Sequence, residues 1–143
     1  MENIQRLMSF RTQSKRVAAK YGNQKVGCTQ GHSHRSKLEA SVCQVLFLRE
    51  KAREIVMLQV EDHVKLSDAE ILYVADFKCM DLRTSELFWV EAKGFAAPTW
   101  PIKKKLWKFY GPGKLEIWTG HYNTPTLSET LIPKTKSPLA RIN

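Results

Sequence analysis

Hydrophobic residues recur at helical spacing in two stretches of the chain. The first helix is predicted from Ser36 to about residue 53, with an apolar face that comprises Leu38, Val42, Val45 and Leu46. Ser36 and Glu39 have the spacing of a capping box at its start. The second helix is predicted over residues 100–110, between a Thr-Trp-Pro start and a Gly-Pro-Gly stop. Its inward face is expected to comprise Ile102, Leu106, Phe109 and Tyr110.

Apolar runs bounded by turn residues predict four strands. They lie within residues 55–66, 71–82, 87–93 and 114–119, and residues 81–86 fit a hairpin connection. Residues 22–34 are rich in Gly, His and polar side chains and are predicted to form a loop. The order α-β-β-β-α-β indicates an α/β fold in which helices flank one mixed central sheet.

The length of 143 residues fits one domain, which we expect to span residues 31–120. Residues 1–30 are expected to form a basic N-terminal arm or helix. Residues 121–143 are rich in Thr, Pro and Ser and are expected to form an extended C-terminal tail. Three cysteines without paired spacing, and no apolar run long enough to cross a bilayer, favour a soluble cytoplasmic protein without a membrane partner.

The net charge of +9 is unevenly distributed along the chain. Residues 1–38 carry eight Lys or Arg and one acid (+7), residues 39–97 seven and eleven (−4), and residues 98–143 eight and two (+6). A basic protein can use its charge for solubility alone or for binding a polyanion. The acidic middle between basic flanks favours a metal-holding centre whose edges contact nucleic acid.

Candidate catalytic residues lie at the ends of the second and third predicted strands. Asp76 ends one apolar run, and Glu91 and Lys93 follow another. Side chains two apart in a strand share a face, so a hairpin would bring Asp76 beside Glu91 and Lys93. This set fits phosphodiester hydrolysis with Mg²⁺ or Mn²⁺, with the backbone carbonyl of Ala92 as a further ligand. The alternative is that Lys93 only neutralises Glu91 at a strand end.

Two other groups of residues allow more than one interpretation. Glu39 is explained by helix capping, or it leans toward the sheet as a third carboxylate. Cys28, His32, His34 and Cys43 suggest zinc, but C-x₃-H-x-H is not a common structural zinc pattern, and the fourth ligand would lie on the helix. We therefore expect His32 and His34 in a polar loop at the edge of the carboxylate site.

The segments HRSKLEAS (34–41), YVADF (73–77) and WVEAKG (89–94), in this order, resemble the PD-(D/E)XK nuclease superfamily. The pattern is most similar to small phage-encoded endonucleases of the endonuclease I, Holliday-junction-resolvase type. The resemblance covers roughly residues 30–120. It implies a restriction-endonuclease-like core, metal ligands Asp76 and Glu91, a catalytic Lys93 and Glu39 on the first helix. Ser36 and Gln59 match positions at the edge of the family's site, whereas Ala75 replaces the proline of the superfamily name.

Basic residues around this site are candidates for contact with DNA phosphates, which give affinity without sequence information. They are Lys103, Lys104, Lys105 and Lys108 on the second helix, together with Arg35, Lys37, Arg11, Lys15 and Arg16. A solvated helix face would explain the four lysines equally well. Trp100, on the same helix, either packs into the core or stacks on an unpaired base.

The sequence thus predicts a metal-dependent DNA endonuclease that acts on branched or replicating phage DNA in a bacterial host. Two symmetric cuts at a four-way junction would imply a homodimer. The alternatives are a nicking, end-processing or transposase-type nuclease subunit, and a catalytically inactive DNA-binding accessory protein. A small RNA nuclease or RNA-binding module is a further alternative.

Overall fold

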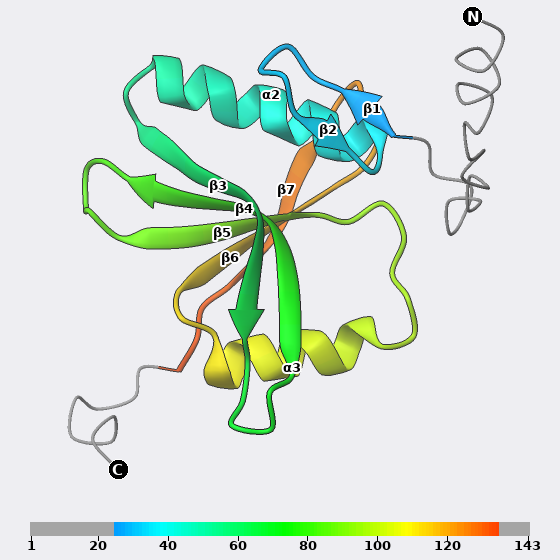
Figure 1. Ribbon diagram of the computed structural model, residues 1–143, viewed down its shortest axis with the longest axis vertical. Coiled ribbons are helices and arrows are strands. Elements are labelled where there is room, and N and C mark those ends of the chain that lie inside the picture. The colour runs from blue at the N-terminus through cyan, green and yellow to red at the C-terminus, as the bar shows by residue number, and fades with distance from the viewer. Residues whose placement is uncertain (1–24, 135–143) are drawn as a thin grey trace, which may run out of the picture.

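The computed structural model describes residues 25–134 of the chain (Figure 1). One sheet contains the strands β3 (Ile55–Lys65), β4 (Leu72–Asp81), β5 (Leu87–Ala92), β6 (Lys114–Thr119) and β7 (Thr126–Leu131), in that order. Within it β5 and β6 are parallel and the other neighbours are antiparallel. Helix α3 (Trp100–Tyr110) forms the crossover from β5 to β6. The prediction of an α/β fold with a mixed sheet flanked by helices is confirmed.

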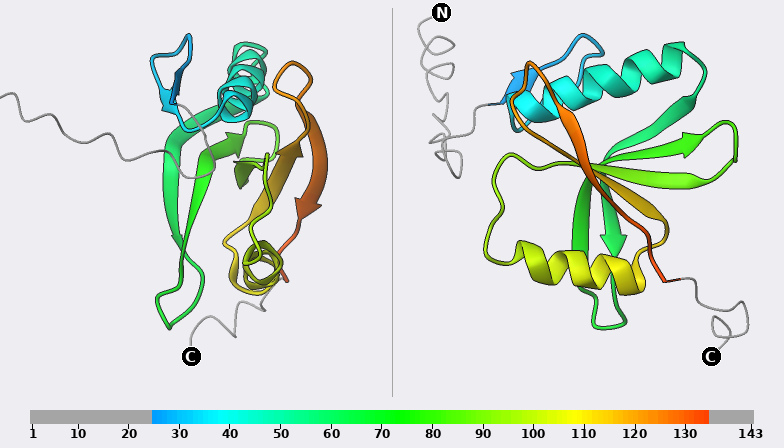
Figure 2. Two further views of the ribbon diagram at one scale, coloured as in Figure 1. Left: turned by 90° about the vertical axis from the view of Figure 1, so that its right-hand side faces the viewer. Right: turned by 180° about the vertical axis from the view of Figure 1, so that it is seen from behind.

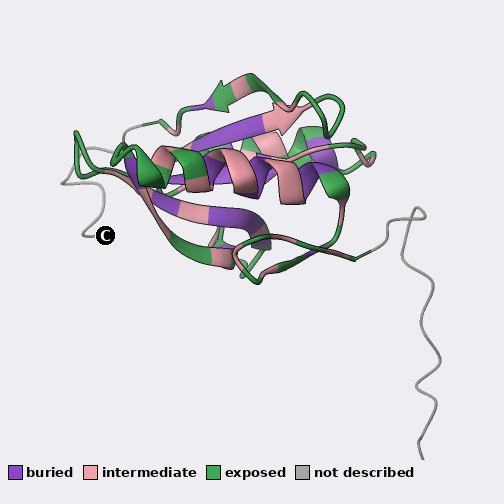
Figure 3. Ribbon diagram, turned by 90° about the horizontal axis from the view of Figure 1, so that it is seen from above, coloured by how far each residue is buried: buried purple, intermediate pink, exposed green. Residues whose placement is uncertain are grey.

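Helix α2 (Lys37–Lys51) follows the predicted apolar stripe and ends two residues earlier than expected. Ser36 adopts an extended conformation, and its Oγ accepts a hydrogen bond from the Glu39 backbone N–H at 3.1 Å. This satisfies one of the free N–H groups of the first turn. The buried residues of α2 pack against residues of the sheet, and Figure 3 shows buried and more exposed positions alternating along the helix.

The two helices lie at opposite ends of the molecule and cover different parts of the sheet (Figure 2). Around α2 the core comprises Leu38, Val42, Cys43, Leu46, Ile55, Phe77, Cys79, Phe88 and Val90. Around α3 it comprises Val64, Leu66, Tyr73, Ala75, Trp89, Trp100, Trp107, Leu115, Ile117 and Leu131. The long hairpin of β3 and β4 contributes to both cores, because its two halves pack against different helices.

The change of core along this hairpin occurs where Glu61 and Asp76 lie opposite each other. Val60 pairs with Phe77, and Asp62 pairs with Ala75, which leaves Glu61 and Asp76 between the two pairs. Glu61 has a φ of 55°, a left-handed conformation that is uncommon for a non-glycine residue. The backbone irregularity therefore places Asp76 at the junction of the two cores, beside the end of β5.

The part of the predicted loop that the structure describes, residues 25–34, is not a simple loop. Strands β1 (Val26–Gly27) and β2 (Ser33–His34) pair as a short antiparallel hairpin. Its turn is held by hydrogen bonds from the Cys28 N–H to the His32 carbonyl and from the Gly31 N–H to the Cys28 carbonyl. Gly31 has a φ of 83°, which glycine adopts without a steric penalty. The strands are too short to produce a hydrophobic pattern.

The prediction of an extended tail from residue 121 is wrong for residues 126–131, which form β7 against β6. Most β7 side chains are exposed, so the strand lacks the alternation that would reveal it. It is held instead by backbone pairing, by buried Leu131 and by a 3.0 Å hydrogen bond from Ser128 Oγ to the Ile117 carbonyl. The folded unit thus extends beyond the predicted domain of residues 31–120.

Helix α3 has the predicted bounds, but a different face is turned inward. Trp100 and Trp107 are buried, whereas Ile102, Phe109 and Tyr110 are exposed. The Trp107 indole N–H donates to the Gly113 carbonyl at 2.9 Å, and its ring contacts those of Tyr73 and Trp89. The large indoles bury more apolar area than Ile or Phe would, and they set the rotation of the helix. Neither helix of the described part of the chain is both long and apolar enough to cross a membrane.

Candidate active site

Three carboxylates from three elements converge beside the junction of the two cores. Asp76 lies on β4, Glu91 on β5 and Glu39 on the first turn of α2, and their residues are only 4, 7 and 3% exposed. Asp76 Oδ2 accepts a 2.8 Å hydrogen bond from the Ala92 backbone N–H. This bond fixes Asp76 against the residue that follows Glu91, so the predicted approach of the two strand ends occurs.

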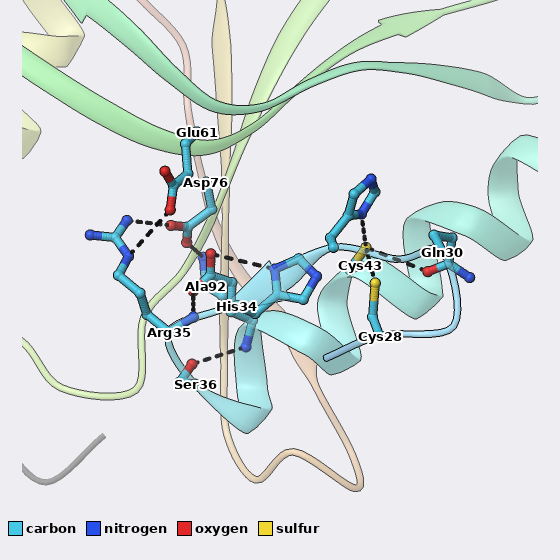
Figure 4. A network of polar contacts seen from close by, with 11 residues as sticks. Cys28, Gln30, His34, Arg35, Ser36, Cys43, Glu61, Asp76 and Ala92 are labelled. Atoms are coloured by element: carbon cyan, nitrogen blue, oxygen red, sulfur yellow. Dashed lines mark hydrogen bonds and ion pairs between the residues drawn. The ribbon is translucent and has the colours of Figure 1, made fainter. Parts of the chain in front are cut away.

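Arg35 connects Glu39 with Asp76 (Figure 4). Its backbone N–H donates to Glu39 Oε2 at 3.0 Å, and its Nη2 lies 3.5 Å from Asp76 Oδ1. Glu39 therefore points toward the sheet while its own N–H is capped by Ser36. Glu39 therefore takes part in the cap of α2 and also belongs to the carboxylate group.

Glu91 and Lys93 share a face of β5, as their spacing predicts. The Lys93 ammonium lies 3.2 Å from Glu91 Oε1 and 4.4 Å from the centre of the Trp100 ring. The Lys93 backbone N–H donates to the Trp118 carbonyl at 2.7 Å, which continues the β5–β6 pairing beyond Ala92. Because backbone, carboxylate and indole all constrain it, Lys93 has a defined position at the edge of the group.

The protein groups around the carboxylates neutralise them only in part. Within residues 25–134, Lys93 pairs with Glu91 and Arg35 with Asp76, whereas Glu39 has no Lys or Arg side-chain partner. The buried oxygens Glu39 Oε1 and Glu91 Oε2 make no close hydrogen bond; Glu39 Oε1 lies 3.6 Å from His34 Nδ1, and the Tyr73 hydroxyl is near Glu91. Burial, followed by the Glu91 and Glu39 carboxylates, raises the pKa of Asp76 well above its ordinary value. Burial also raises the pKa of Glu91, and Lys93 opposes this shift. Buried acidic oxygens without partners are costly unless a cation binds them, and hard divalent cations prefer such ligands.

Glu61 and Tyr73 also lie next to residues of this group, and neither is predicted from the sequence as a site residue. Glu61 Oε1 lies 3.8 Å from Arg35 Nε, opposite Asp76 on the neighbouring strand. Tyr73 is buried, and burial together with the nearby Glu91 carboxylate raises its pKa. Only the strand register, which the sequence does not reveal, places Glu61 beside Arg35.

The predicted residues at the edge of the site have different positions. Ser36 caps α2, and Gln59 is exposed and lines a surface hollow with Gln30 and His32. The expectation that His34 lies in a polar loop is wrong, because the residue is fully buried on β2 and its ring packs against Phe77. Burial lowers the pKa of this imidazole. For Ala92, the backbone N–H contacts Asp76, while the carbonyl remains a predicted metal ligand.

Of the candidate DNA-binding residues in the described part of the chain, Arg35 contacts the carboxylate group directly, and the others lie on α2 and α3. Lys105, Lys108, Arg35 and Lys37 are exposed. Lys103 is also exposed, and its Nζ lies 5.9 Å from the centre of the Tyr73 ring. Lys104 forms an ion pair with Glu129 on β7, so its charge is partly used within the fold. Arg11, Lys15 and Arg16, with the predicted N-terminal arm, lie outside the described residues.

Comparison with protein-family models, curated proteins and solved structures finds no significant match for this chain. The chemistry of the site is therefore inferred from its own geometry. Three buried carboxylates can hold a divalent cation, and a lysine at their edge can contact an anionic substrate. Exposed basic residues nearby can bind the phosphates on either side of a reacting bond.

Proposed function

We propose that this chain is a metal-dependent endonuclease with a restriction-endonuclease-like core of the PD-(D/E)XK type. The observation that carries the proposal is the convergence of Glu39, Asp76 and Glu91 with Lys93. Among the described residues, Lys93 and Arg35 pair with Glu91 and Asp76, and Glu39 has no Lys or Arg side-chain partner. A purely structural group of this kind would be expected to pair its charges completely. Incomplete pairing is instead expected where a ligand completes the site.

In this proposal Asp76 and Glu91 hold Mg²⁺ or Mn²⁺, with Glu39 as a third carboxylate. When bound, the cation neutralises phosphoryl charge and lowers the pKa of a water molecule. Lys93 is 3.2 Å from Glu91, so it can reach both that carboxylate and a phosphate oxygen bound beside it. Arg35, at 3.5 Å from Asp76 and exposed, is placed to hold a neighbouring phosphate.

DNA is the proposed substrate because exposed Arg35 contacts the carboxylate group, and further exposed basic side chains, Lys37, Lys103 and Lys105, lie on the two helices. Contacts from such residues go to the backbone and carry no sequence information. The described part of the chain is also small, and most of its residues belong to the sheet and the two helices. We therefore infer recognition of DNA shape, such as a branch, rather than of a base sequence. Symmetric cutting of a junction would require a homodimer.

The experiment that tests this function is incubation of the full chain with end-labelled substrates in Mg²⁺, Mn²⁺ or EDTA. The substrates are a four-way junction, a replication fork, linear duplex, single-stranded DNA and a matched RNA. We expect metal-dependent cutting within the DNA, fastest on the branched molecules. Cutting of all DNA substrates at equal rates would support a general nuclease, and preferential cutting of RNA would refute the choice of DNA. Tight DNA binding without any cutting would indicate the accessory-protein alternative.

A further inference from the structure

A second group of ligand side chains lies on the other side of Glu39. We propose that Cys28, His32, His34 and Cys43 bind one Zn²⁺ ion in a structural site distinct from the carboxylate group. One ligand atom from each of the four residues lies within 4.8 Å of all the others. Two thiolates and two imidazoles form a donor set that selects zinc over Mg²⁺ or Mn²⁺.

Local structure on two elements assembles these four residues. The β1–β2 turn brings Cys28 and His32 together through the 3.0 Å hydrogen bond between their backbones. His32 and His34 are two residues apart at the start of β2, so their side chains project to the same side. Cys43 lies one turn after Glu39 on α2 and is fully buried. The fourth ligand therefore lies on the helix. The fold brings the four residues together although their spacing in the sequence is unusual.

The distances between the ligand atoms fit a tetrahedral ion. With ordinary Zn–S and Zn–N bonds, a tetrahedron separates two sulfurs by about 3.8 Å and a sulfur from a nitrogen by about 3.6 Å. The Sγ atoms of Cys28 and Cys43 are 3.9 Å apart, and His32 Nδ1 lies 3.4 Å from Cys43 Sγ. The same two separations also permit hydrogen bonds that involve sulfur. The measured zinc content distinguishes a bound ion from such direct pairing.

The buried imidazole of His34 is the second, independent observation. Its residue has no exposed surface, and neither Nδ1 nor Nε2 has a hydrogen-bond partner within residues 25–134. Leaving two ring nitrogens unpaired in a core is costly. Nδ1 lies 3.6 Å from Glu39 Oε1, which leaves Nε2 for the ion, and Figure 4 shows His34 between the carboxylates and the two sulfurs. Two thiolates would also balance the charge of Zn²⁺ in this buried position.

The arrangement gives the zinc site a role beside the active site. A metal-bound histidine commonly donates its other ring N–H to a carboxylate, which orients both groups. Here that carboxylate is Glu39, whose Oε1 has no other partner among the described residues. Zinc would thus hold the β1–β2 hairpin on α2 and position Glu39 through His34. His34 is a positioning residue in this account, and the existence of the ion does not depend on nuclease activity.

The test measures zinc in the full chain after expression with added zinc and exhaustive buffer exchange under a reductant. We expect about one zinc ion per chain in the wild type. In Cys28→Ser we expect the zinc content to be lower by more than about tenfold. Cys79→Ser is the matched control, because Cys79 is a buried cysteine outside the cluster. Asp76→Asn should also retain zinc, since it changes only the carboxylate group. In the Co²⁺-loaded protein, thiolate charge-transfer absorption should be present in the wild type and absent from Cys28→Ser.

Cys28→Ser could lack zinc because it does not fold, so a second measurement uses the wild type alone. Titration of the wild type with an organomercurial should release zinc in step with modification of the cysteine thiols. The proposal is overturned if wild type and Cys28→Ser contain equal zinc, or if zinc is lost from Asp76→Asn but kept in Cys28→Ser. It is equally overturned if the wild type binds no zinc when Cys28 and Cys43 are both reduced.

Discussion

Asp76→Asn should abolish catalysis and yet make the metal-free protein more stable. Asp76 is buried beside two other carboxylates, and its charge is opposed by a single, exposed arginine. Asparagine has almost the same shape, and its amide oxygen can still accept the 2.8 Å hydrogen bond from the Ala92 N–H. The substitution therefore removes the repulsion while keeping the main backbone contact. A gain in stability on loss of function is the expected signature of a metal site.

The size of this gain follows from the neighbours of Asp76. Two unit charges roughly 5 Å apart interact by about 3 kcal/mol at an effective dielectric constant near 20. The Glu39 and Glu91 carboxylates repel the Asp76 charge. Arg35 attracts it, but the Arg35 side chain is 57% exposed, so solvent screens this attraction. Partial protonation already relieves some repulsion, so we expect the free energy of unfolding to rise by about 1–3 kcal/mol. For a domain of this size the melting temperature would rise by roughly 4–12 °C.

The assay is thermal unfolding in EDTA at several pH values, with Asp68→Asn, an exposed aspartate in the β3–β4 turn, as control. The pKa of Asp76 is raised in the folded state above the ordinary value of 3.8. The unfolded state therefore loses its proton first as pH rises, and the metal-free wild type loses stability from that value up to the raised pKa. Asp76→Asn should lack this part of the decline. A variant less stable than wild type in EDTA at about pH 8 would refute the reasoning.

Three further results are expected. Lys93→Ala should retain metal binding but slow cleavage by roughly 10²–10³-fold in single-turnover kinetics; an unchanged rate would remove Lys93 from the mechanism. Replacing Lys105 and Lys108 by Ala should weaken DNA binding and reduce its salt slope by about one per lost phosphate contact. Fluorescence anisotropy measures this, and an unchanged slope would contradict it. Arg53→Gly should raise the free energy of unfolding by about 1 kcal/mol in urea denaturation, because Arg53 has a φ of 60° after α2; a loss of stability would count against this explanation.

Most of the secondary structure could be predicted because local signals determine it. The bounds of α3 and β6 match the sequence prediction, and Ser36 caps α2 as expected. These elements combine apolar periodicity with stop signals such as the Gly-Pro-Gly after α3. Strand β7 and the β1–β2 hairpin could not be predicted, because backbone pairing with neighbours holds them and few of their side chains are buried.

The candidate site divides in the same way. The strand period was sufficient to place Glu91 beside Lys93, and a hairpin was sufficient to bring Asp76 to them. Glu61 depends on the register of β3 with β4, and the link through Arg35 depends on the orientation of α2; neither follows from spacing. The sequence spacing of Cys28, His32, His34 and Cys43 is irregular and does not predict a zinc site. Tertiary packing, and not that spacing, sets the distances between its ligand atoms.

The most direct test of the central claim is cleavage of an end-labelled four-way junction by wild type, Asp76→Asn and Asp68→Asn at equal concentration. Wild type and Asp68→Asn are expected to cut the junction in Mg²⁺ and not in EDTA, whereas Asp76→Asn is expected to bind the junction without cutting it. Cutting by Asp76→Asn at the wild-type rate, or equal cutting in EDTA, would contradict the assignment of the carboxylate group as the active site.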